Sequence, residues 1–484
     1  MSFVETFEPR ALWRHFDRIL TIPRGSKEEE PMRRYVIEVA ERRGLSWQAD
    51  AAGNLVVRKP ASRGREAAPV TILQSHLDMV NEKDSDVMHD FSKDPIVPRQ
   101  EGGLLYASGT TLGADNGIGV AAMLALLESD DVAHGPLELL FTVDEETGLT
   151  GAQGLDGGML TGRRLLNLDS EEEGAVTVGC AGAGDSTLRL PLRTEPTPFG
   201  SLALRVRLGG LHGGHSGTEI HLQRGNAIKL LARILHAVAL EIPFQLFGLQ
   251  GGNKRNAIPR EATALLVVRE LGREAFAERV RREFEAVRAE YAVADPGLAL
   301  SLDEAALPSE VWTADSHRTA LDLLEALPHG VLAMSLDIPG LVETSSNVAT
   351  VQVQGGALQV GCATRSSVGS ALRAARRRMR SIARLAHASI EQNPGYPGWK
   401  PNLQSPLLGL VGEVHAELFG KKPDVRAVHA GLECGIIGEK VPGMDMLSVG
   451  PQIDSPHSPQ EHVKISSVAD FWRLLTASLE RLAA

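Results

Sequence analysis

The chain has 484 residues, of which 43% are hydrophobic and 23% are charged, and its net charge is −11. This length exceeds what one hydrophobic core usually organises, so we expect two or three domains. The acidic balance argues against nucleic acid as a partner, because binding phosphates requires a basic surface. Three isolated cysteines exclude a disulfide framework and a thiolate zinc cluster. The N-terminus lacks a signal-peptide core and the longest apolar run is far shorter than a membrane span, so we expect a cytoplasmic protein that does not bind membranes.

The first 185 residues alternate helical and strand patterns. Apolar spacing predicts helices within 11–20, 31–44 and 118–129, and strands within 54–60, 70–80, 137–143 and 164–170. Strands that alternate with helices indicate an α/β fold with a mostly parallel sheet. In such sheets, sites form beyond the carboxyl ends of the strands. The segments HLD, DEE and LDS all fall at such ends.

A different pattern begins near residue 186 and continues to 395. Two mixed sets of strands and helices follow each other, and each resembles a small βαββαβ half. The second set includes a strand within 298–305 and a long helix through Ile390. We interpret 186–395 as an inserted domain, which the glycine-rich segment GCAGAG leads into. The linker NPGYPGWKPNLQSP marks the return, so 1–185 and 396–484 are expected to form one discontinuous domain.

Two motifs of the first domain carry residue types that suit a metal site. His76 and Asp78, in SHLDMV, lie two residues apart on a predicted strand, so their side chains share a face. A carboxylate in that position can orient an imidazole whose other nitrogen binds a metal. Asp115, in GADNGIG, lies where a loop meets a helix, and the helix N-terminus favours its ionised form. Taken singly, a paired structural histidine and a plain helix N-cap explain these residues equally well.

Acids also follow two more predicted strands. The run LELLFTV ends in Asp144, Glu145 and Glu146, where burying a carboxylate is costly. Asp169 follows the strand RLLNL, and His457 lies in IDSPHSPQE near the C-terminus. Each acid alone fits a solvated loop. Together, however, acids and histidines at several ends of one sheet edge predict a bound cation.

The ordered motifs resemble a known family. SHLDMV, GTTLGADNGIG, DEETGLTGA, NLDSEEEG, GGHSG, GGNKRNAIP, HAGLECG and SPHSPQE are similar to motifs of the di-zinc dipeptidases, and most closely of the bacterial aminoacyl-histidine dipeptidases, also called cytosolic non-specific dipeptidases. The resemblance extends from about Ile22 to Val468. It implies two Zn²⁺ per chain, which Mn²⁺ or Co²⁺ can replace, and a dipeptide as the small-molecule substrate, Xaa-His dipeptides included. The chain would be a monomer or a homodimer.

The resemblance also implies a role for each residue of the metal centre. His76 and Asp169 would hold one zinc and Glu146 and His457 the other, with Asp115 bridging both. Asp78 would orient His76. Glu145 would be the general base that activates a metal-bridged hydroxide to attack the peptide bond. The family also predicts a cis peptide bond between Asp115 and Asn116.

Further residues would contact the substrate. The resemblance makes His215, in LHGGHSG, a lid histidine that donates to the substrate carbonyl oxygen. Asn256 and Arg365 would contact the peptide and its carboxylate, for which a guanidinium is suited. Glu433 could accept the substrate ammonium, or it could be structural, as could His429. Two alternatives stay open: a deacylase of N-acyl amino acids that uses the same metals, and a non-catalytic binding protein.

Overall fold

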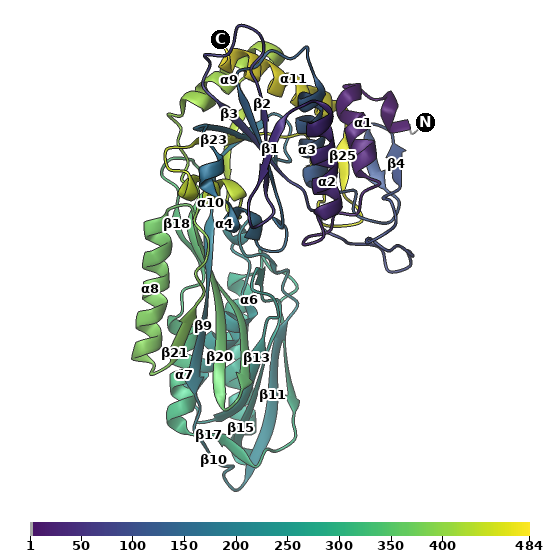
Figure 1. Cartoon of the computed structure of the whole chain (residues 1–484). Coiled ribbons are helices and arrows are strands. Elements are labelled where there is room, and N and C mark those ends of the chain that lie inside the picture. The colour runs from purple at the N-terminus through teal and green to yellow at the C-terminus, as the bar shows by residue number, and fades with distance from the viewer. Residues whose placement is uncertain (1–2) are drawn as a thin grey trace. The chain divides into compact units, whose positions relative to one another are not determined.

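The computed structural model describes residues 3–484. Contacts divide the chain into two units (Figure 1). Unit 1 comprises Met1–Cys180, Trp399–Ala427 and Leu432–Ala484, and unit 2 comprises Ala181–Gly398 and Val428–Gly431. Unit 1 is therefore discontinuous and contains both ends of the chain. Over residues 3–484, we find no helix with the length and apolar character needed to cross a membrane.

An eight-stranded sheet forms the centre of unit 1. Its strands, in sheet order, are β1 (Ser46–Ala49), β2 (Leu55–Lys59), β6 (Leu137–Thr142), β3 (Thr71–His76), β7 (Arg164–Asn167), β23 (Asp445–Ser448), β8 (Ala175–Cys180) and β22 (Asp424–Val428). The four central strands β6, β3, β7 and β23 are parallel, whereas β1 pairs antiparallel with β2, β2 with β6, and β8 with β23. The predicted α/β fold with a mainly parallel sheet is thus confirmed in the centre of the sheet.

Helices cover this sheet closely. Every residue of β3, β6 and β8 is buried, as expected for strands covered on both faces. The helices of unit 1 are α1 (Arg10–Ile19), α2 (Glu30–Arg42), α3 (Ala114–Glu128), α4 (Thr150–Gly154), α9 (Pro406–Phe419), α10 (Glu433–Lys440) and α11 (Ile465–Leu482). Helix α3 packs against β3 and against α1 and α2, while α9 packs against β23 and α11. A small antiparallel sheet consists of β24 (Ile453–Asp454), β25 (His462–Lys464), β5 (Leu104–Ala107) and β4 (Pro98–Glu101).

Unit 2 contains one nine-stranded antiparallel sheet. Its main path is β16 (Ala299–Glu304), β11 (Ser201–Gly209), β15 (Ala262–Arg269), β13 (Gln245–Gly251), β19 (Val342–Gln354), β20 (Ala357–Ser366), β9 (Gly182–Pro191) and β21 (Ser389–Gln392), with β18 (Gly330–Met334) beside β19. Short pairs are β10 (Thr194–Pro196) with β17 (Glu310–Trp312), and β12 (Gly214–His215) with β14 (Ala257–Ile258). The helices are α5 (Ala227–Ala239), α6 (Arg273–Glu290), α7 (Ala314–Ala326) and α8 (Gly369–Leu385).

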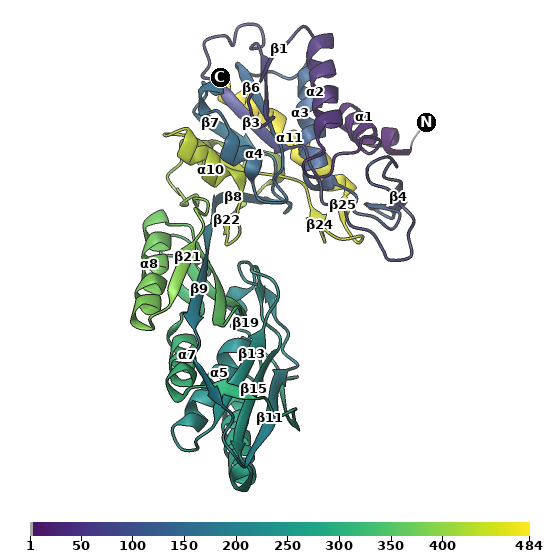
Figure 2. The ribbon, with the colours of Figure 1, turned by 60° about the horizontal axis from the view of Figure 1, so that its bottom comes forward.

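The two predicted halves of unit 2 are present, and one is nested in the other. Strand β9 follows β8 directly along the chain (Figure 2) and pairs with β20 and β21, which come after the first half is complete. The first half, β11-α5-β13-β15-α6-β16, is thus inserted between β9 and α7 of the second. The halves meet where Gly251 of β13 pairs with Val351 of β19.

Two expectations for this region are corrected. The strand in 298–305 does not open the second half, because β16 pairs with β11 and completes the first half. The helix predicted through Ile390 ends at Leu385. His387 has a φ of 54°, which breaks the helix, and Ile390 lies on β21 opposite Leu188.

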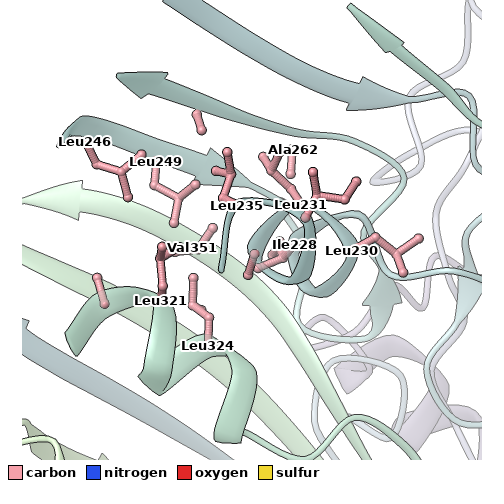
Figure 3. Close-up of a cluster of buried hydrophobic side chains, with 14 of the residues drawn as sticks. Ile228, Leu230, Leu231, Leu235, Leu246, Leu249, Ala262, Leu321, Leu324 and Val351 are labelled. Carbon is pink, nitrogen blue, oxygen red and sulfur yellow. The ribbon is translucent and has the colours of Figure 1, made fainter. Parts of the chain in front are cut away.

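The core of unit 2 is apolar. Buried residues of α5 and α7, including Leu231, Leu235 and Leu321, pack against Leu246 of β13 and Val351 of β19 (Figure 3). Strand β9 alternates between buried and more exposed positions because the apolar core covers one face of the sheet, whereas the last seven residues of β20 are all buried.

Candidate metal centre

Four ligand candidates meet at one edge of the unit 1 sheet. His76 is the last residue of β3, Glu146 follows β6 and Asp169 follows β7. These three strands are adjacent and parallel, so their carboxyl ends lie at the same edge. Asp115, at the start of α3, approaches the same place, because His76 Nε2 lies 3.1 Å from Asp115 Oδ1.

His76 lies between three carboxylates. Its Nε2 is 3.1 Å from Asp115 Oδ1 and 3.2 Å from Asp169 Oδ1. Its Nδ1 is 3.3 Å from Asp78 Oδ1, and the side chain is 1% exposed. His76, Asp115 and Asp169 thus form one group whose potential ligand atoms all lie within 4.8 Å of one another.

A second group forms around His457. Its Nε2 lies 3.2 Å from Asp115 Oδ2 and 3.0 Å from Glu146 Oε2. The two oxygens of Asp115 therefore face different histidines, and Asp115 belongs to both groups. This is the arrangement expected of a carboxylate that bridges two cations.

The atoms present fit bound cations better than they fit hydrogen bonds alone. An imidazole Nε2 carries at most one hydrogen, yet each of these two nitrogens faces two carboxylate oxygens. The second oxygen of Glu146 is buried and has no hydrogen-bond partner among the described residues. Ligands ~2.1 Å from a tetrahedral zinc lie ~3.4 Å apart, close to the separations found here. The donor set, histidine nitrogen with carboxylate oxygen, also suits zinc.

Burial and mutual repulsion shift the pKa values of these groups. Hydrogen bonds to Asp115 and Glu146 raise the pKa of His457 to about 11. Burial lowers the pKa of His76, but Asp169 and the other nearby carboxylates outweigh this effect and hold it well above the ordinary value. Burial, with Asp115 and Glu146, raises the pKa of Asp169 to about 6 although His76 opposes the rise. The centre thus carries more negative charge than its histidines neutralise.

The three consecutive acids after β6 have different surroundings. Glu145 and Glu146 form a third group with His76, with ligand atoms within 4.8 Å. Burial raises the pKa of Glu145 well above its usual value, with further contributions from neighbouring acids. Asp144 instead accepts hydrogen bonds from the hydroxyls of Thr147 and Thr150. Only Glu145 and Glu146 therefore belong to the candidate centre.

Two buried carboxylates hold the backbone of these acids in place. Asp78 accepts the N–H groups of Glu145 and Glu146 at 3.1 and 3.2 Å, and the hydroxyl of Ser26 at 2.8 Å. Burial opposes ionisation of Asp78, but its hydrogen bonds to His76 and these groups lower its pKa to about 2. Glu29 accepts the N–H of Asp144 at 2.9 Å. Glu29 lies in the charged run KEEEP, where no local pattern distinguishes it from its neighbours.

The peptide bond between Asp115 and Asn116 is cis, as predicted. Asn116 is buried, and its amide donates to Leu168 O at 2.8 Å and to the carboxylate of Asp169. Residues 115 and 116 have non-helical backbone angles, so the regular part of α3 begins after them. The two hydrogen bonds of the Asn116 amide link the loop of Asp115 to the loop of Asp169.

Glu433, at the start of α10, lies deep in unit 1. Its side chain is 0% exposed, and Oε2 accepts hydrogen bonds from Gln74 Nε2 at 2.6 Å and Thr142 Oγ1 at 2.7 Å. Its other oxygen, Oε1, has no partner among the described residues. Burial raises the pKa of Glu433 to about 8.

Apart from Glu433, the residues expected to bind substrate belong to unit 2. His215 lies on β12, and its Nδ1 accepts the N–H of Thr218 at 3.0 Å. At Gly217, an added Cβ would come within 3.0 Å of His215 Cε1 and 3.1 Å of Arg365 Nε, so His215 and Arg365 flank one glycine. The backbone oxygen of Asn256 accepts the N–H of Ser216 at 2.8 Å. Unit 2 therefore brings His215, Asn256 and Arg365 into one neighbourhood.

Comparisons with known proteins identify the family of this chain. Over residues 72–481 the sequence matches the family described as peptidase family M20/M25/M40. The chain is 43% identical over 484 residues to the cytosol non-specific dipeptidase of Escherichia coli K12, with both chains covered completely. It is similar to the crystal structure of aminoacylhistidine dipeptidase from Vibrio alginolyticus, with 41% identity, a TM-score of 0.92, and coverage of 99% and 98% of the two chains. An aminopeptidase from Bacillus cereus shares the fold, with 16% identity, a TM-score of 0.58, and coverage of 99% and 100%. The chain belongs to peptidase family M20/M25/M40.

Proposed function

We propose that this chain is a zinc-dependent dipeptidase that hydrolyses unblocked dipeptides, Xaa-His dipeptides included. The observation that carries the proposal is the position of Asp115, whose two oxygens lie 3.1 and 3.2 Å from two different histidines, each of which also has a second carboxylate neighbour. The names of the Escherichia coli and Vibrio alginolyticus relatives supply the substrate class. The name of the first relative also supports a cytoplasmic location.

In this proposal the two groups hold two zinc ions. His76 and Asp169 would hold one ion, Glu146 and His457 would hold the other, and Asp115 would be shared by both. Asp78 holds His76 in orientation through Nδ1. The three ligand carboxylates balance three of the four positive charges of two zinc ions, which accounts for acids concentrated at one sheet edge.

When bound, the metals would lower the pKa of a water molecule and polarise the substrate carbonyl. The proposal assigns the proton transfers to Glu145. Its carboxylate accepts a proton from the attacking water and delivers it to the leaving amine. Asp78 supports this role, because it fixes the backbone N–H groups of Glu145 and Glu146.

Unit 2 would recognise the substrate. His215 donates to the carbonyl oxygen, Asn256 contacts the peptide and Arg365 binds the C-terminal carboxylate. Arg365 is 9% exposed and its Nε has no hydrogen-bond partner among the described residues, which leaves a donor for a ligand. An ammonium contact by Glu433 stays a prediction that depends on its Oε1, since Gln74 and Thr142 occupy Oε2.

The test is hydrolysis of a panel of dipeptides, including β-alanyl-histidine, by the zinc-loaded chain, with N-acetyl amino acids assayed in parallel. Cleavage of the dipeptides that a chelator abolishes is the expected result. Turnover of the acetylated substrates alone would replace the dipeptidase with a deacylase. Bound zinc without any turnover would favour a binding protein. Sedimentation of the same preparation would distinguish a monomer from a homodimer.

A further inference from the structure

One buried carboxylate outside the proposed ligand set contacts the loop that carries Asp115. Glu461 is 2% exposed. Its Oε2 accepts the N–H groups of Leu112 and Gly113 at 2.7 and 2.8 Å, and its Oε1 accepts those of Ala114 and Asp115 at 2.7 and 3.2 Å. Four consecutive backbone donors, the last of them from Asp115 itself, thus converge on one side chain.

Arg24 holds the same loop from its carbonyl side. It is 2% exposed, and it donates to Leu77 O at 3.1 Å, to Asp78 O at 2.7 Å and to Gly113 O. The guanidinium therefore joins the segment that follows His76 to the loop that precedes Asp115. An added Cβ on Gly113 would lie 2.5 Å from Arg24 Nη2, so the loop passes close to the arginine. Glu461 thus accepts the N–H groups of this loop, and Arg24 donates to a carbonyl oxygen of the same loop, that of Gly113.

Glu461 also belongs to the segment that carries His457. The side chain of His457 is 51% exposed, and its turn contains two non-glycine residues with positive φ, Ser455 at 54° and His457 at 60°. Such angles are unfavourable for most residues unless the surrounding structure imposes them. Two buried residues flank this exposed turn along the chain: Ile453 of β24 before it, and Glu461, four residues after His457. The carboxylate of Glu461 joins the His457 segment to the Asp115 loop.

We propose that Glu461 is a positioning residue that sets the distance between Asp115 and His457, and thereby the affinity of the metal that these two residues share with Glu146. The inference rests on the proposed two-metal function. The other metal also shares Asp115, but it depends less on Glu461 because its remaining ligands, His76 and Asp169, follow strands β3 and β7, which pair directly in the sheet. Loss of Glu461 should therefore weaken one of the two metals selectively.

The variant Glu461→Gln tests this selectivity. A glutamine side chain offers one acceptor oxygen, and its NH₂ group would face backbone N–H donors. Glu461→Asp keeps both acceptor oxygens but is one methylene shorter, so its affinity for the second zinc ion should lie between those of wild type and Glu461→Gln. Glu138→Gln is a matched control. Glu138 is also 2% exposed and accepts the N–H groups of Thr161 and Gly162 at 2.9 and 3.1 Å, at the opposite end of β6 from the metal centre.

The measurement is calorimetric titration of the metal-free, full-length chain with zinc, together with hydrogen exchange at residues 112–115. Wild type and Glu138→Gln should bind two ions. Glu461→Gln should keep one site and weaken the other by about 10- to 100-fold, the range for loss of a residue that orients a ligand, and its amides 112–115 should exchange faster.

Two unchanged sites in Glu461→Gln would overturn this inference alone. Failure of wild type to bind two ions would overturn the proposed function and this inference with it. If Glu461→Gln does not fold, the same comparison is made with Glu461→Asp, where an unchanged second site is the contrary result.

Discussion

The two units bury charge in different amounts. Unit 1 buries carboxylates at several places, among them Glu29, Asp78, Glu138, Glu433 and Glu461. Within 181–398 and 428–431, by contrast, the buried carboxylate is that of Asp295, and most of the remaining interior is apolar. Asp295 accepts the N–H groups of His212 and Gly225 at 2.7 and 2.6 Å, so its charge is compensated by backbone.

This difference separates two kinds of buried acid. Glu29, Asp78 and Glu461 resemble Asp295, because backbone N–H groups satisfy them. Glu146 instead faces His457, and one of its oxygens is buried without a partner in the described chain. Burying a charge is costly unless it is paired or coordinates a metal. Among the described residues, the groups of histidines and acids that could hold a cation lie in unit 1, and the proposed metal centre accounts for the buried oxygen of Glu146.

The largest expected effect separates Glu145 from the ligand acids beside it. In Glu145→Gln, activity should fall by about 10²–10⁴-fold, since general acid–base catalysis typically contributes this much. Zinc content, measured by atomic absorption, should stay at the wild-type value because Glu145 is not a proposed ligand. Asp169→Asn is the contrasting variant and should lose both metal and activity. A fully active Glu145→Gln enzyme would remove Glu145 from the mechanism.

Metal removal should affect the units unequally. Zinc at a hundredfold excess over its dissociation constant stabilises the state that binds it by about 2.7 kcal/mol. Hydrogen exchange of the full chain with and without a chelator measures this locally. Amides of 112–115 and 143–147 in unit 1 should lose protection, whereas those of β19 and β20 in unit 2 should not. Equal loss in both units would mean that the metals do not act locally in unit 1.

The sequence predicts the parts of unit 1 that depend on local pattern. Short runs rich in aliphatic residues predict β3 and β6, and the positions of His76, Glu146 and Asp169 follow from the ends of their strands. Parallel strands bring such ends together whatever the intervening sequence is. The assignment of roles came from ordered motifs and not from periodicity.

Supporting residues could not be found in this way. Glu461 accepts N–H groups from a loop that precedes it by almost 350 residues, and an acid that binds backbone has no local signature. The nested order of unit 2 has no local signature for the same reason, because β9 pairs with strands that come after the first half. The apolar pattern extends the preceding helix to Ile390, because a four-residue strand such as β21 is too short to show its own period.

A smaller effect concerns Arg365, the buried guanidinium of unit 2. If it binds the substrate carboxylate, Arg365→Lys should lose one arm of a bidentate contact, at a cost of about 1.5 kcal/mol, or roughly tenfold in KM. The KM of dipeptide amides, which lack that carboxylate, should change little. Equal effects on acids and amides would indicate that Arg365 supports the fold of unit 2 instead of binding substrate.

The smallest effect is a pH dependence of unit 2 that involves no metal ligand. His317 on α7 is 7% exposed, its ring packs edge-on against Phe244 at 4.6 Å, and burial lowers its pKa to about 4. Between pH 6.5 and 4 the unfolded chain therefore binds a proton that the folded chain does not, so this contribution to stability is complete above pH 6.5 and is lost as the pH falls. From pH 7 to 5.5, this effect lowers the free energy of unfolding by about 1 kcal/mol.

Hydrogen exchange of residues 314–326 in wild type and in His317→Leu checks this prediction. The wild type should lose more protection on acidification, because leucine cannot be protonated. The same pH dependence of exchange protection in both proteins would show that His317 is protonated as easily in the folded state as in the unfolded state. Unit 2 would then tolerate this buried charge.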